Sequence, residues 1–315
     1  MWWDAAAVHP ASRLPPQLDG AFSVADAMRA GVTRRRLRAA DLNAPFRGSR
    51  MIITNSIAAS EFEQQHIALV DRCRGYLPVA PPIFAFSHST AAALYRMPLP
   101  PRLPGAPLDV CVPITAQPPR RRGVAGHRAD TAIRYLGGLP IVAPEVAWRQ
   151  LAPLLSLDEL VVVGDFLVRR KRPLSRYELL EQAVDDAAGA RGSVRARAAH
   201  RDIRVGTDSR PESRVRLVLI RAGLPEPVVH HTDYDDDGFF VGTPDLAYVR
   251  ERIAIEVEGA GHWSDRDTFE DDILRRELFQ RSRWHVIQVT SRQLNHPALV
   301  VRRVSNALDE RATEG

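Results

Sequence analysis

Three acidic residues, Asp245, Glu256 and Glu258, have the spacing that could bring carboxylates together on two adjoining strands. In the segment IAIEVE, residues 253–258, apolar side chains alternate with the two glutamates, so an extended chain places both glutamates on one face. A two-residue loop at Arg250 and Glu251 would set Asp245 directly opposite Glu256 on that same face. The pattern therefore predicts one group of carboxylates on a β-hairpin.

Such a group predicts a bound divalent cation. Like charges that stand opposite one another destabilise a sheet unless something neutralises them. Mg²⁺ prefers oxygen ligands, usually one or two carboxylates together with waters and substrate phosphate. We expect Asp245, Glu256 and Glu258 to be the metal ligands, with Mg²⁺ as the ion and Mn²⁺ as an alternative. The competing interpretation is an exposed hairpin with ordinary solvated acids.

Two further residues are candidates for the same site. Glu212 ends the segment Ser209-Arg210-Pro211-Glu212, which also fits an S-x-x-E capping box, so a helix cap and a site role are both open and do not exclude each other. His262 follows Glu258 after a glycine-rich exit from the strand, and it is expected to reach the site, although a lone histidine is more often structural or solvated. Gln288 is a weaker candidate, because a polar residue inside an apolar strand often faces solvent.

The elements that must position these residues begin at about residue 208. A helix is expected at 211–222, with Gly223 ending it. Strands are expected at 228–232, 245–249, 253–258 and 284–290, and two later helices at 264–280 and 297–308. The order α-β-β-β-α-β-α predicts an α/β domain.

The N-terminal segment predicts a small winged helix-turn-helix. Ser23 can cap a short helix at 24–30 that Gly31 ends, and Thr33 can cap a second helix at 34–40, followed by a strand or wing at 46–53. Arg34, Arg35 and Arg38 lie on this second helix and are expected to bind DNA, with Leu37 turned toward the core. A solvated basic helix is the alternative.

The whole chain is expected to be divided as follows: a winged helix-turn-helix at 14–55, a mixed α+β middle domain at 56–172, a helical connector at 173–207 and the α/β domain at 208–315. The middle domain is expected to hold helices at 57–73, 87–95, 146–155 and 157–168 and strands at 83–86 and 108–112.

Composition narrows the class of protein. Lys and Arg outnumber Asp and Glu by 43 to 38, an excess that permits nucleic-acid binding, and basic residues cluster at 34–36, 120–122 and 169–172. The two cysteines form no CxxC pair or disulfide framework, which favours a reducing cytoplasm. No signal-peptide pattern and no apolar run of membrane-spanning length are found, so no membrane partner is expected.

The C-terminal residues resemble the PD-(D/E)XK nuclease superfamily. Pro244-Asp245, ten residues and then Glu256-Val257-Glu258 match its core pattern. More narrowly, the segment is similar to the very-short-patch repair (Vsr-like) endonucleases and their uncharacterised bacterial relatives, in the residues Pro211, Glu212, Arg216, Leu219, Gly223, Glu258, Gly259, His262, Asp272 and Arg275.

The resemblance implies a restriction-endonuclease-like fold and Mg²⁺-dependent hydrolysis of DNA. Its motif usually has a lysine where this chain has Glu258, and an acid there can bind metal instead. The resemblance then leaves Glu258, His262 and Glu212 as the candidate catalytic residues, with His262 the natural choice for activating water.

The N-terminal part resembles the winged-helix domain of AbiEi-type (type IV) antitoxins. The segment FSVADAMRAGVTRRRLRAADL carries this resemblance, and SHSTAAALYRMPLP resembles the region that follows in such proteins. It implies DNA binding or regulation without an enzyme.

Two functions therefore compete. The first is a metal-dependent DNA endonuclease with an N-terminal DNA-binding domain, acting in repair or in defence against foreign DNA. The second is a non-catalytic, antitoxin-like transcriptional regulator that uses a degenerate nuclease fold. Both have DNA as the partner, and the oligomeric state, a homodimer included, stays open.

Overall fold

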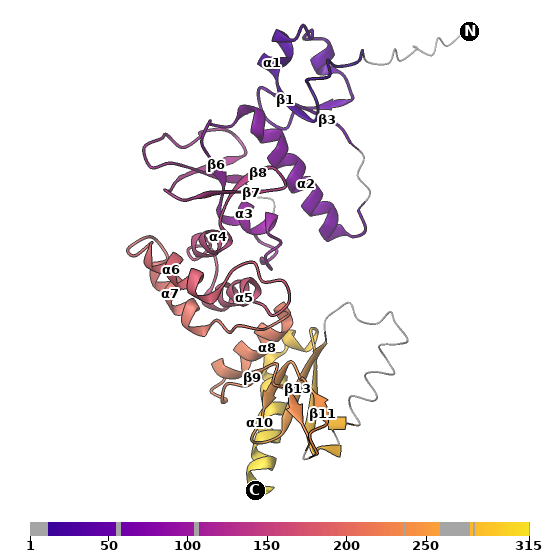
Figure 1. Cartoon of the computed structure of the whole chain (residues 1–315), viewed down its shortest axis with the longest axis vertical. Coiled ribbons are helices and arrows are strands. Elements are labelled where there is room, and N and C mark those ends of the chain that lie inside the picture. The colour runs from indigo at the N-terminus through magenta and orange to yellow at the C-terminus, as the bar shows by residue number, and fades with distance from the viewer. Residues whose placement is uncertain are drawn as a thin grey trace, which may run out of the picture. The chain divides into compact units, whose positions relative to one another are not determined.

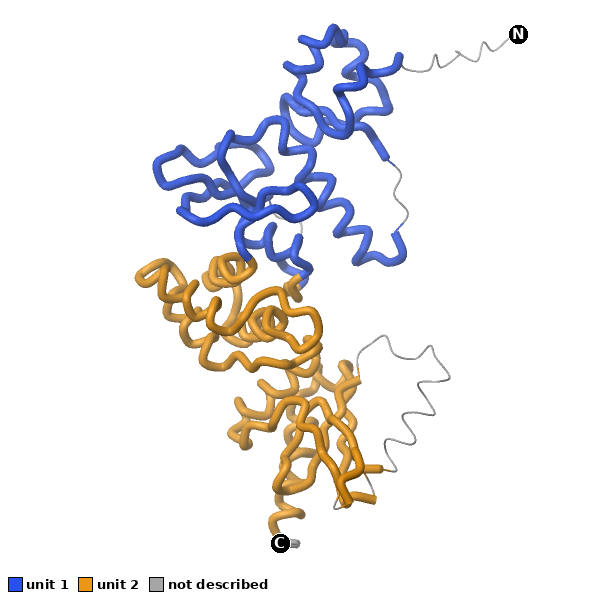
Figure 2. Tube along the Cα trace, in the orientation of Figure 1, with its two compact units in different colours: residues 1–96, 101–143 blue, residues 97–100, 144–315 orange. Residues whose placement is uncertain are grey.

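The computed structural model describes residues 12–54, 58–103, 107–235, 237–258, 278–279 and 281–314. The protein is a mixed α/β chain with helices and several sheets (Figure 1). It divides into two compact units, the first made of residues 1–96 and 101–143, the second of residues 97–100 and 144–315 (Figure 2). Within the described ranges, none of the helices has the length and apolar character needed to cross a membrane.

The N-terminal part of the first unit is a small sheet with a helix. Strands β1 (Ala21–Ser23), β3 (Ser49–Ile52) and β2 (Leu42–Asn43) pair antiparallel in the order β1-β3-β2. Helix α1 (Val24–Arg29) begins where the Asp26 N–H donates to the Ser23 side chain. Gly31 then turns the chain with a φ of +82°, so the predicted first helix, its cap and its stop are confirmed. The core residues here are Leu18, Phe22, Ala27, Val32 and Leu37.

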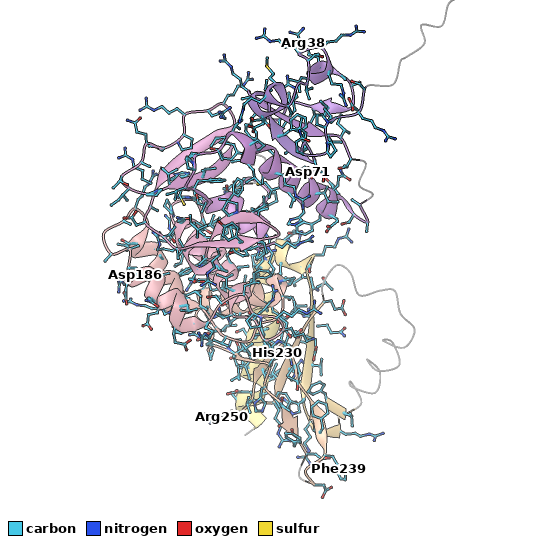
Figure 3. The ribbon with its side chains drawn as sticks, turned by 45° about the horizontal axis from the view of Figure 1, so that its top comes forward. Arg38, Asp71, Asp186, His230, Phe239 and Arg250 are labelled. Carbon is cyan, nitrogen blue, oxygen red and sulfur yellow. The ribbon has the colours of Figure 1, made fainter. Side chains whose placement is uncertain are left out.

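The prediction of a second helix at 34–40 is wrong. A single 3-10 turn, η1 (Arg36–Arg38), forms in its place, and the Arg36 side chain binds Asp41 through two hydrogen bonds of 2.8 and 2.7 Å. The extended backbone of Ala39 then leads the chain toward β2. Arg34, Arg35 and Arg38 are exposed, as Figure 3 shows for Arg38, but they do not share one face of an α-helix.

A five-stranded sheet forms the rest of the first unit, in the order β6-β5-β4-β8-β7. Strand β5 has the predicted bounds, and the helices expected at 57–73 and 87–95 are found with shifted ends, whereas β6, β7 and β8 were not predicted. The elements are α2 (Glu61–Tyr76), η2 (Leu77–Val79), β4 (Ala85–Phe86), α3 (His88–Leu94), β5 (Leu108–Val112), β6 (Val124–Arg128), β7 (Ile133–Leu136) and β8 (Leu139–Val142).

The second unit begins with a helical part. It contains the two helices expected at 146–155 and 157–168, so the division between units falls inside the predicted middle domain 56–172. The segment 173–207 forms two helices that pack on the first two, so it is part of this unit and not a bare connector. A side chain at Gly164 would meet Ile203 at 2.2 Å, which shows how closely α5 and the end of α7 approach. The helices are α4 (Pro144–Gln150), α5 (Leu157–Leu167), α6 (Tyr177–Asp185) and α7 (Ser193–Asp202).

The C-terminal part of the second unit is a four-stranded sheet in the order β14-β13-β12-β9. Strand β13 has the predicted bounds; it runs antiparallel to β12 and parallel to β14. Two helices and the sheet share a core of Val215, Leu219, Ile253, Ile255 and Val304, among others (Figure 1). The elements are α8 (Arg210–Arg221), β9 (Val228–Val229), β12 (Leu246–Tyr248), β13 (Ile253–Glu258), β14 (His285–Thr290), η3 (Gln293–Asn295) and α10 (Pro297–Glu314).

A small hairpin of β10 (Asp233–Tyr234) and β11 (Phe240–Gly242) precedes β12. Phe239 lies at its turn with 71% of its surface exposed (Figure 3). The other face of the sheet packs against Val241, Phe279 and Trp284. Most of the helix expected at 264–280, together with His262, lies outside the described residues.

Candidate functional site

One row of residues across the four-stranded sheet is polar at every position. The pairing of β12 with β13 sets Leu246 opposite Ile255, so the next residue, Asp245, stands opposite Glu256 as the hairpin register predicted. The N–H of His230 donates to the carbonyl oxygen of Asp245 at 3.1 Å, which continues the ladder between β9 and β12. On the far side Glu256 pairs with Gln288. The row is therefore His230, Asp245, Glu256 and Gln288.

The neighbouring row explains why the strands hold this register. Val229, Leu246, Ile255 and Ile287 lie opposite one another and all pack in the core formed with α8 and α10. A shift of one residue in any pairing would turn these apolar side chains away from that core. The same burial that fixes the apolar row thus fixes the polar one.

The end of the polar row meets the first turn of α8. One donor atom from each of Glu212, His230 and Asp245 lies within 4.8 Å of the others. Nε2 of His230 is 3.2 Å from Oε2 of Glu212, and Glu212 is only 5% exposed. Two carboxylates and an imidazole therefore converge from a helix N-terminus and two strands.

Glu212 combines a helix-end role with its place in this group. Its N–H donates to Oγ of Ser209, the cap of α8, at 3.3 Å. Its side chain accepts the N–H of Asp208 at 2.8 Å, where a full capping box would have it accept the N–H of Ser209. The cap and the site were both open from the sequence, and the structure is compatible with both.

The surroundings keep two carboxylates ionised. Burial alone would raise the pKa of Glu212, but hydrogen bonds from His230, from Ser209 and from the Asp208 N–H outweigh it and lower the pKa below its ordinary value. Burial likewise opposes the charged form of Asp208, and hydrogen bonds from Arg170 and from the Lys171 N–H lower its pKa. The charged forms of Glu212 and Asp208 are thus favoured.

The backbone restrains the remaining two members. Oδ2 of Asp245 accepts the N–H of Val257 at 2.8 Å, so the carboxylate is held across the hairpin. His230 has a φ of +46°, a left-handed conformation that is uncommon for a residue with a side chain. Such strained residues cluster at functional sites, where the surrounding structure maintains them.

The predicted residues are only partly brought together. Asp245 and Glu212 are in the group, whereas Glu256 and Glu258, predicted as metal ligands, are not among its members. His262 lies outside the described residues. His230 was not predicted, since only the pairing of β9 with β12 brings it beside Asp245; the double histidine after Val228 and Val229 was the available signal.

The basic segment 169–172 contacts Asp208, which lies next to the group of Glu212, His230 and Asp245. Arg170 donates to Oδ2 of Asp208 at 2.6 and 3.0 Å, and Nζ of Lys171 lies 4.0 Å from the same atom. The Lys171 side chain is 76% exposed. The basic cluster at 169–172 therefore lies beside the carboxylates, where it could hold a phosphate.

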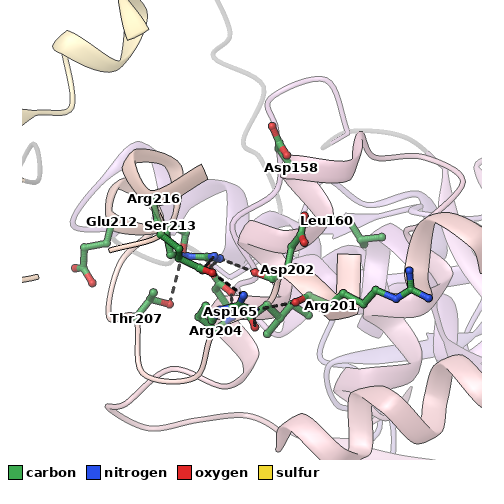
Figure 4. A network of polar contacts seen from close by, with 12 residues as sticks. Asp158, Leu160, Asp165, Arg201, Asp202, Arg204, Thr207, Glu212, Ser213 and Arg216 are labelled. Atoms are coloured by element: carbon green, nitrogen blue, oxygen red, sulfur yellow. Dashed lines mark hydrogen bonds and ion pairs between the residues drawn. The ribbon is translucent and has the colours of Figure 1, made fainter. Parts of the chain in front are cut away.

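A buried ion pair attaches α8 to the helical part of the unit. Arg216 and Asp165 are both fully buried, with Nη2 of Arg216 3.0 Å from Oδ2 of Asp165 (Figure 4). Arg216 also donates to Glu226 at 2.9 Å and to the carbonyl oxygen of Asp202 at 2.8 Å. Burial raises the pKa of Asp165, although Arg216 and the Arg204 N–H oppose that rise. Arg216, which carried part of the nuclease resemblance, is thus a structural residue here.

Comparison with known proteins adds little. No protein-family model matches the sequence, and no curated protein is significantly similar to it. The crystal structure of the RV2827C protein from Mycobacterium tuberculosis matches with 17% identity and a TM-score of 0.37, over 72% of this chain and 92% of that one. At this level of similarity no functional argument follows.

Proposed function

We propose that this chain is a metal-dependent DNA endonuclease whose catalytic domain, residues 208–315, is of the PD-(D/E)XK type. The observation that carries the proposal is the convergence of Glu212, His230 and Asp245 at the end of the polar row. Asp245 and Glu256, which supply the two acids of the motif in the sequence, stand on adjacent strands in the register such a site needs. The element order supports the same assignment for the elements that are described.

The donor set fits a divalent cation. Glu212 and Asp245 would supply carboxylate oxygens and His230 an imidazole nitrogen, all within 4.8 Å of one another. When bound, such an ion orients water, polarises the scissile phosphate and stabilises the leaving oxygen. Carboxylates suit Mg²⁺ and Mn²⁺, whereas an imidazole ligand favours transition metals. We therefore expect Mn²⁺ to support activity at least as well as Mg²⁺.

The residues around the donor set have separate roles in this proposal. Asp208 holds Arg170 and Lys171 at the edge of the site, where their charges can bind the DNA backbone next to the scissile phosphate. Glu258, at the usual lysine position, and His262 remain the proposed residues for positioning or activating water. Glu256 completes the polar row between Asp245 and Gln288 and keeps its proposed role as a further ligand.

The N-terminal part is proposed to recognise DNA as a winged helix. A three-stranded sheet, the capped helix α1 and the turn η1 form around one core. Arg34, Arg35 and Arg38 are exposed on and before η1, so they are available for phosphates even though the longer helix is absent.

A second candidate is the non-catalytic, DNA-binding regulator. Two observations favour it: an acid occupies the lysine position at Glu258, and neither Glu256 nor Glu258 joins the group of Glu212, His230 and Asp245. This alternative predicts DNA binding that depends on salt but not on a divalent ion, and no cleavage.

Cleavage of supercoiled plasmid separates the two functions. Full-length protein is incubated with plasmid in Mn²⁺, in Mg²⁺ and in chelator. Asp245→Asn is compared with Asp237→Asn, an exposed acid on the neighbouring hairpin that serves as the matched control. Nicked or linear product that needs the ion and Asp245, but not Asp237, supports the nuclease. DNA binding without any cleavage supports the regulator.

A further inference from the structure

A second group of potential metal ligands lies in the first unit, whereas the proposed nuclease site belongs to the second. One donor atom from each of His88, Asp109 and His127 lies within 4.8 Å of the others. His88 begins α3, Asp109 is on β5 and His127 is on β6, so three separate elements supply them. The segment SHSTAAALYRMPLP, which contains His88, carried a predicted helix at 87–95 and the antitoxin resemblance, and it gave no indication of a metal ligand.

The backbone geometry explains the convergence. Strands β5 and β6 are parallel, with Cys111 paired to His127, so Asp109 and His127 project from the same face two positions apart. The N–H of Ser87 donates to the carbonyl oxygen of Asp109 at 3.0 Å, which places the start of α3 over this end of β5. His88 has a φ of +47° at that junction.

The distances show a direct contact that an ion would have to open. Nε2 of His127 is 2.8 Å from Oδ1 of Asp109, and the rings of His88 and His127 stack with centroids 3.8 Å apart. Tetrahedral bonds of about 2.1 Å separate two ligand atoms by about 3.4 Å. To admit an ion, the His127–Asp109 pair must therefore widen and the stacked rings must turn so that one nitrogen of each points at the ion.

Neighbouring serine hydroxyl groups also orient His88 and Asp109. Oγ of Ser87, which is fully buried, lies 3.1 Å from Nδ1 of His88. Oγ of Ser89 donates to Oδ2 of Asp109 at 2.5 Å, and Asp109 is 9% exposed. Protein metal sites commonly show this outer layer of hydrogen bonds, which fixes the ring orientation of a histidine and the position of a carboxylate.

The group is open to an ion from solvent. The His127 side chain is 32% exposed, so an ion can reach the group from solvent.

We propose that His88, Asp109 and His127 form a binding site for a divalent transition metal, with Zn²⁺ as the expected ion. Two imidazole nitrogens and one carboxylate oxygen suit Zn²⁺ better than Mg²⁺ or Ca²⁺, which take oxygen ligands. Three protein ligands leave a fourth position for water or for a group from a partner. This site is independent of the proposed nuclease function.

Zn²⁺ titration of the full-length protein tests the proposal. The background variant Glu212→Gln/Asp245→Asn removes both carboxylate ligands of the other group and leaves only its histidine, and ZnCl₂ is titrated into it by calorimetry after chelator treatment. His88→Gln and His127→Gln are made in this background. His66→Gln, a histidine of α2 in the same unit, is the matched control. Far-ultraviolet circular dichroism checks that each variant is folded.

The background protein should bind one equivalent of Zn²⁺. His88→Gln and His127→Gln each remove a ligand and should weaken Zn²⁺ binding by more than about 100-fold, and Ser87→Ala should weaken it by about 10-fold, the lower end of the effect usual for outer residues. His66→Gln should leave the affinity unchanged. The proposal is overturned if the background binds no Zn²⁺, or if folded His88→Gln and His127→Gln bind as tightly as the control. If either variant unfolds, the unfolding temperature of the background protein is measured with and without Zn²⁺. A rise with Zn²⁺ supports the proposed site, and an unchanged unfolding temperature overturns it.

Discussion

Nε2 of His230 lies 3.2 Å from Oε2 of Glu212, while the backbone N–H of the same histidine donates to the carbonyl oxygen of Asp245. One residue thus contacts both the first turn of α8 and the start of β12. Because Asp245 also accepts the N–H of Val257, the contact extends to β13. The candidate site depends on all of these elements keeping their register.

His230 should control which ion supports cleavage. Because the His230 imidazole is a proposed metal ligand, we expect more cleavage product in Mn²⁺ than in Mg²⁺. His230→Asn should lower the cleavage rate in Mn²⁺ by more than about 10-fold and the rate in Mg²⁺ by a smaller factor. Initial rates of plasmid nicking at several concentrations of each ion measure this. His231→Asn, the adjacent histidine, is the control. Equal losses in both ions would show that His230 does not select the metal.

The exposed arginines near η1 should contribute to DNA binding through phosphates. Arg34→Ala/Arg38→Ala should weaken binding and make its dependence on salt shallower, by roughly one unit of slope per lost contact. Fluorescence anisotropy with a labelled duplex at several salt concentrations gives both quantities. Arg36→Ala is no suitable control, because Arg36 binds Asp41. Arg47→Ala, another exposed arginine of the same part, is suitable, and an equal effect there would remove the special role of Arg34 and Arg38.

The first unit should contribute to DNA binding, and the second should carry the cleavage activity. A fragment of residues 144–315 keeps the partners of Arg216, whereas one that starts at Ser209 would lose Asp165 and Asp202 and uncover the side of α8 that packs on α5. The longer fragment should retain metal-dependent cleavage at high DNA concentration but bind DNA less tightly than the full chain. Anisotropy titrations of both proteins test this, and equal affinities would mean that the first unit serves something other than DNA.

The buried ion pair should matter far more for stability than the surface pairs on the same helix. Arg216→Ala leaves Asp165 buried without its cation and should lower the free energy of unfolding by about 3–5 kcal/mol. Arg221→Ala removes partly exposed contacts with Asp158 and Asp202 and should cost less than about 1 kcal/mol. Urea unfolding followed by circular dichroism compares them. Similar losses for the two variants would contradict the role given to burial.

Local patterns predicted the parts of the fold that local forces determine. The alternation of IAIEVE and the short loop after Val249 were enough to place Asp245 opposite Glu256, because a tight turn fixes the register of its own hairpin. Ser23, Ser209 and Gly31 likewise marked helix ends that depend only on nearby residues.

Other features depend on residues distant in sequence or on missed turn signals. His230 joins the site through pairing with a strand that follows the β10–β11 hairpin. The strand β7 is exposed throughout, so no alternation of polar and apolar residues revealed it. Gly137 and Gly138, both at positive φ between paired strands, were an available hairpin signal that the sequence reading missed.

We expect the carboxylates beside His230 to hold a divalent ion that the protein needs in order to hydrolyse DNA. The most direct measurement compares the parent and Asp245→Asn for plasmid cleavage and DNA affinity in the same buffer with Mn²⁺. We expect Asp245→Asn to lower the cleavage rate by more than about 100-fold, beyond the effect usual for outer residues, while the affinity for DNA changes by less than about 3-fold because the basic surface remains. Cleavage by Asp245→Asn at the parent's rate, or no cleavage by the parent in Mn²⁺, would contradict this expectation.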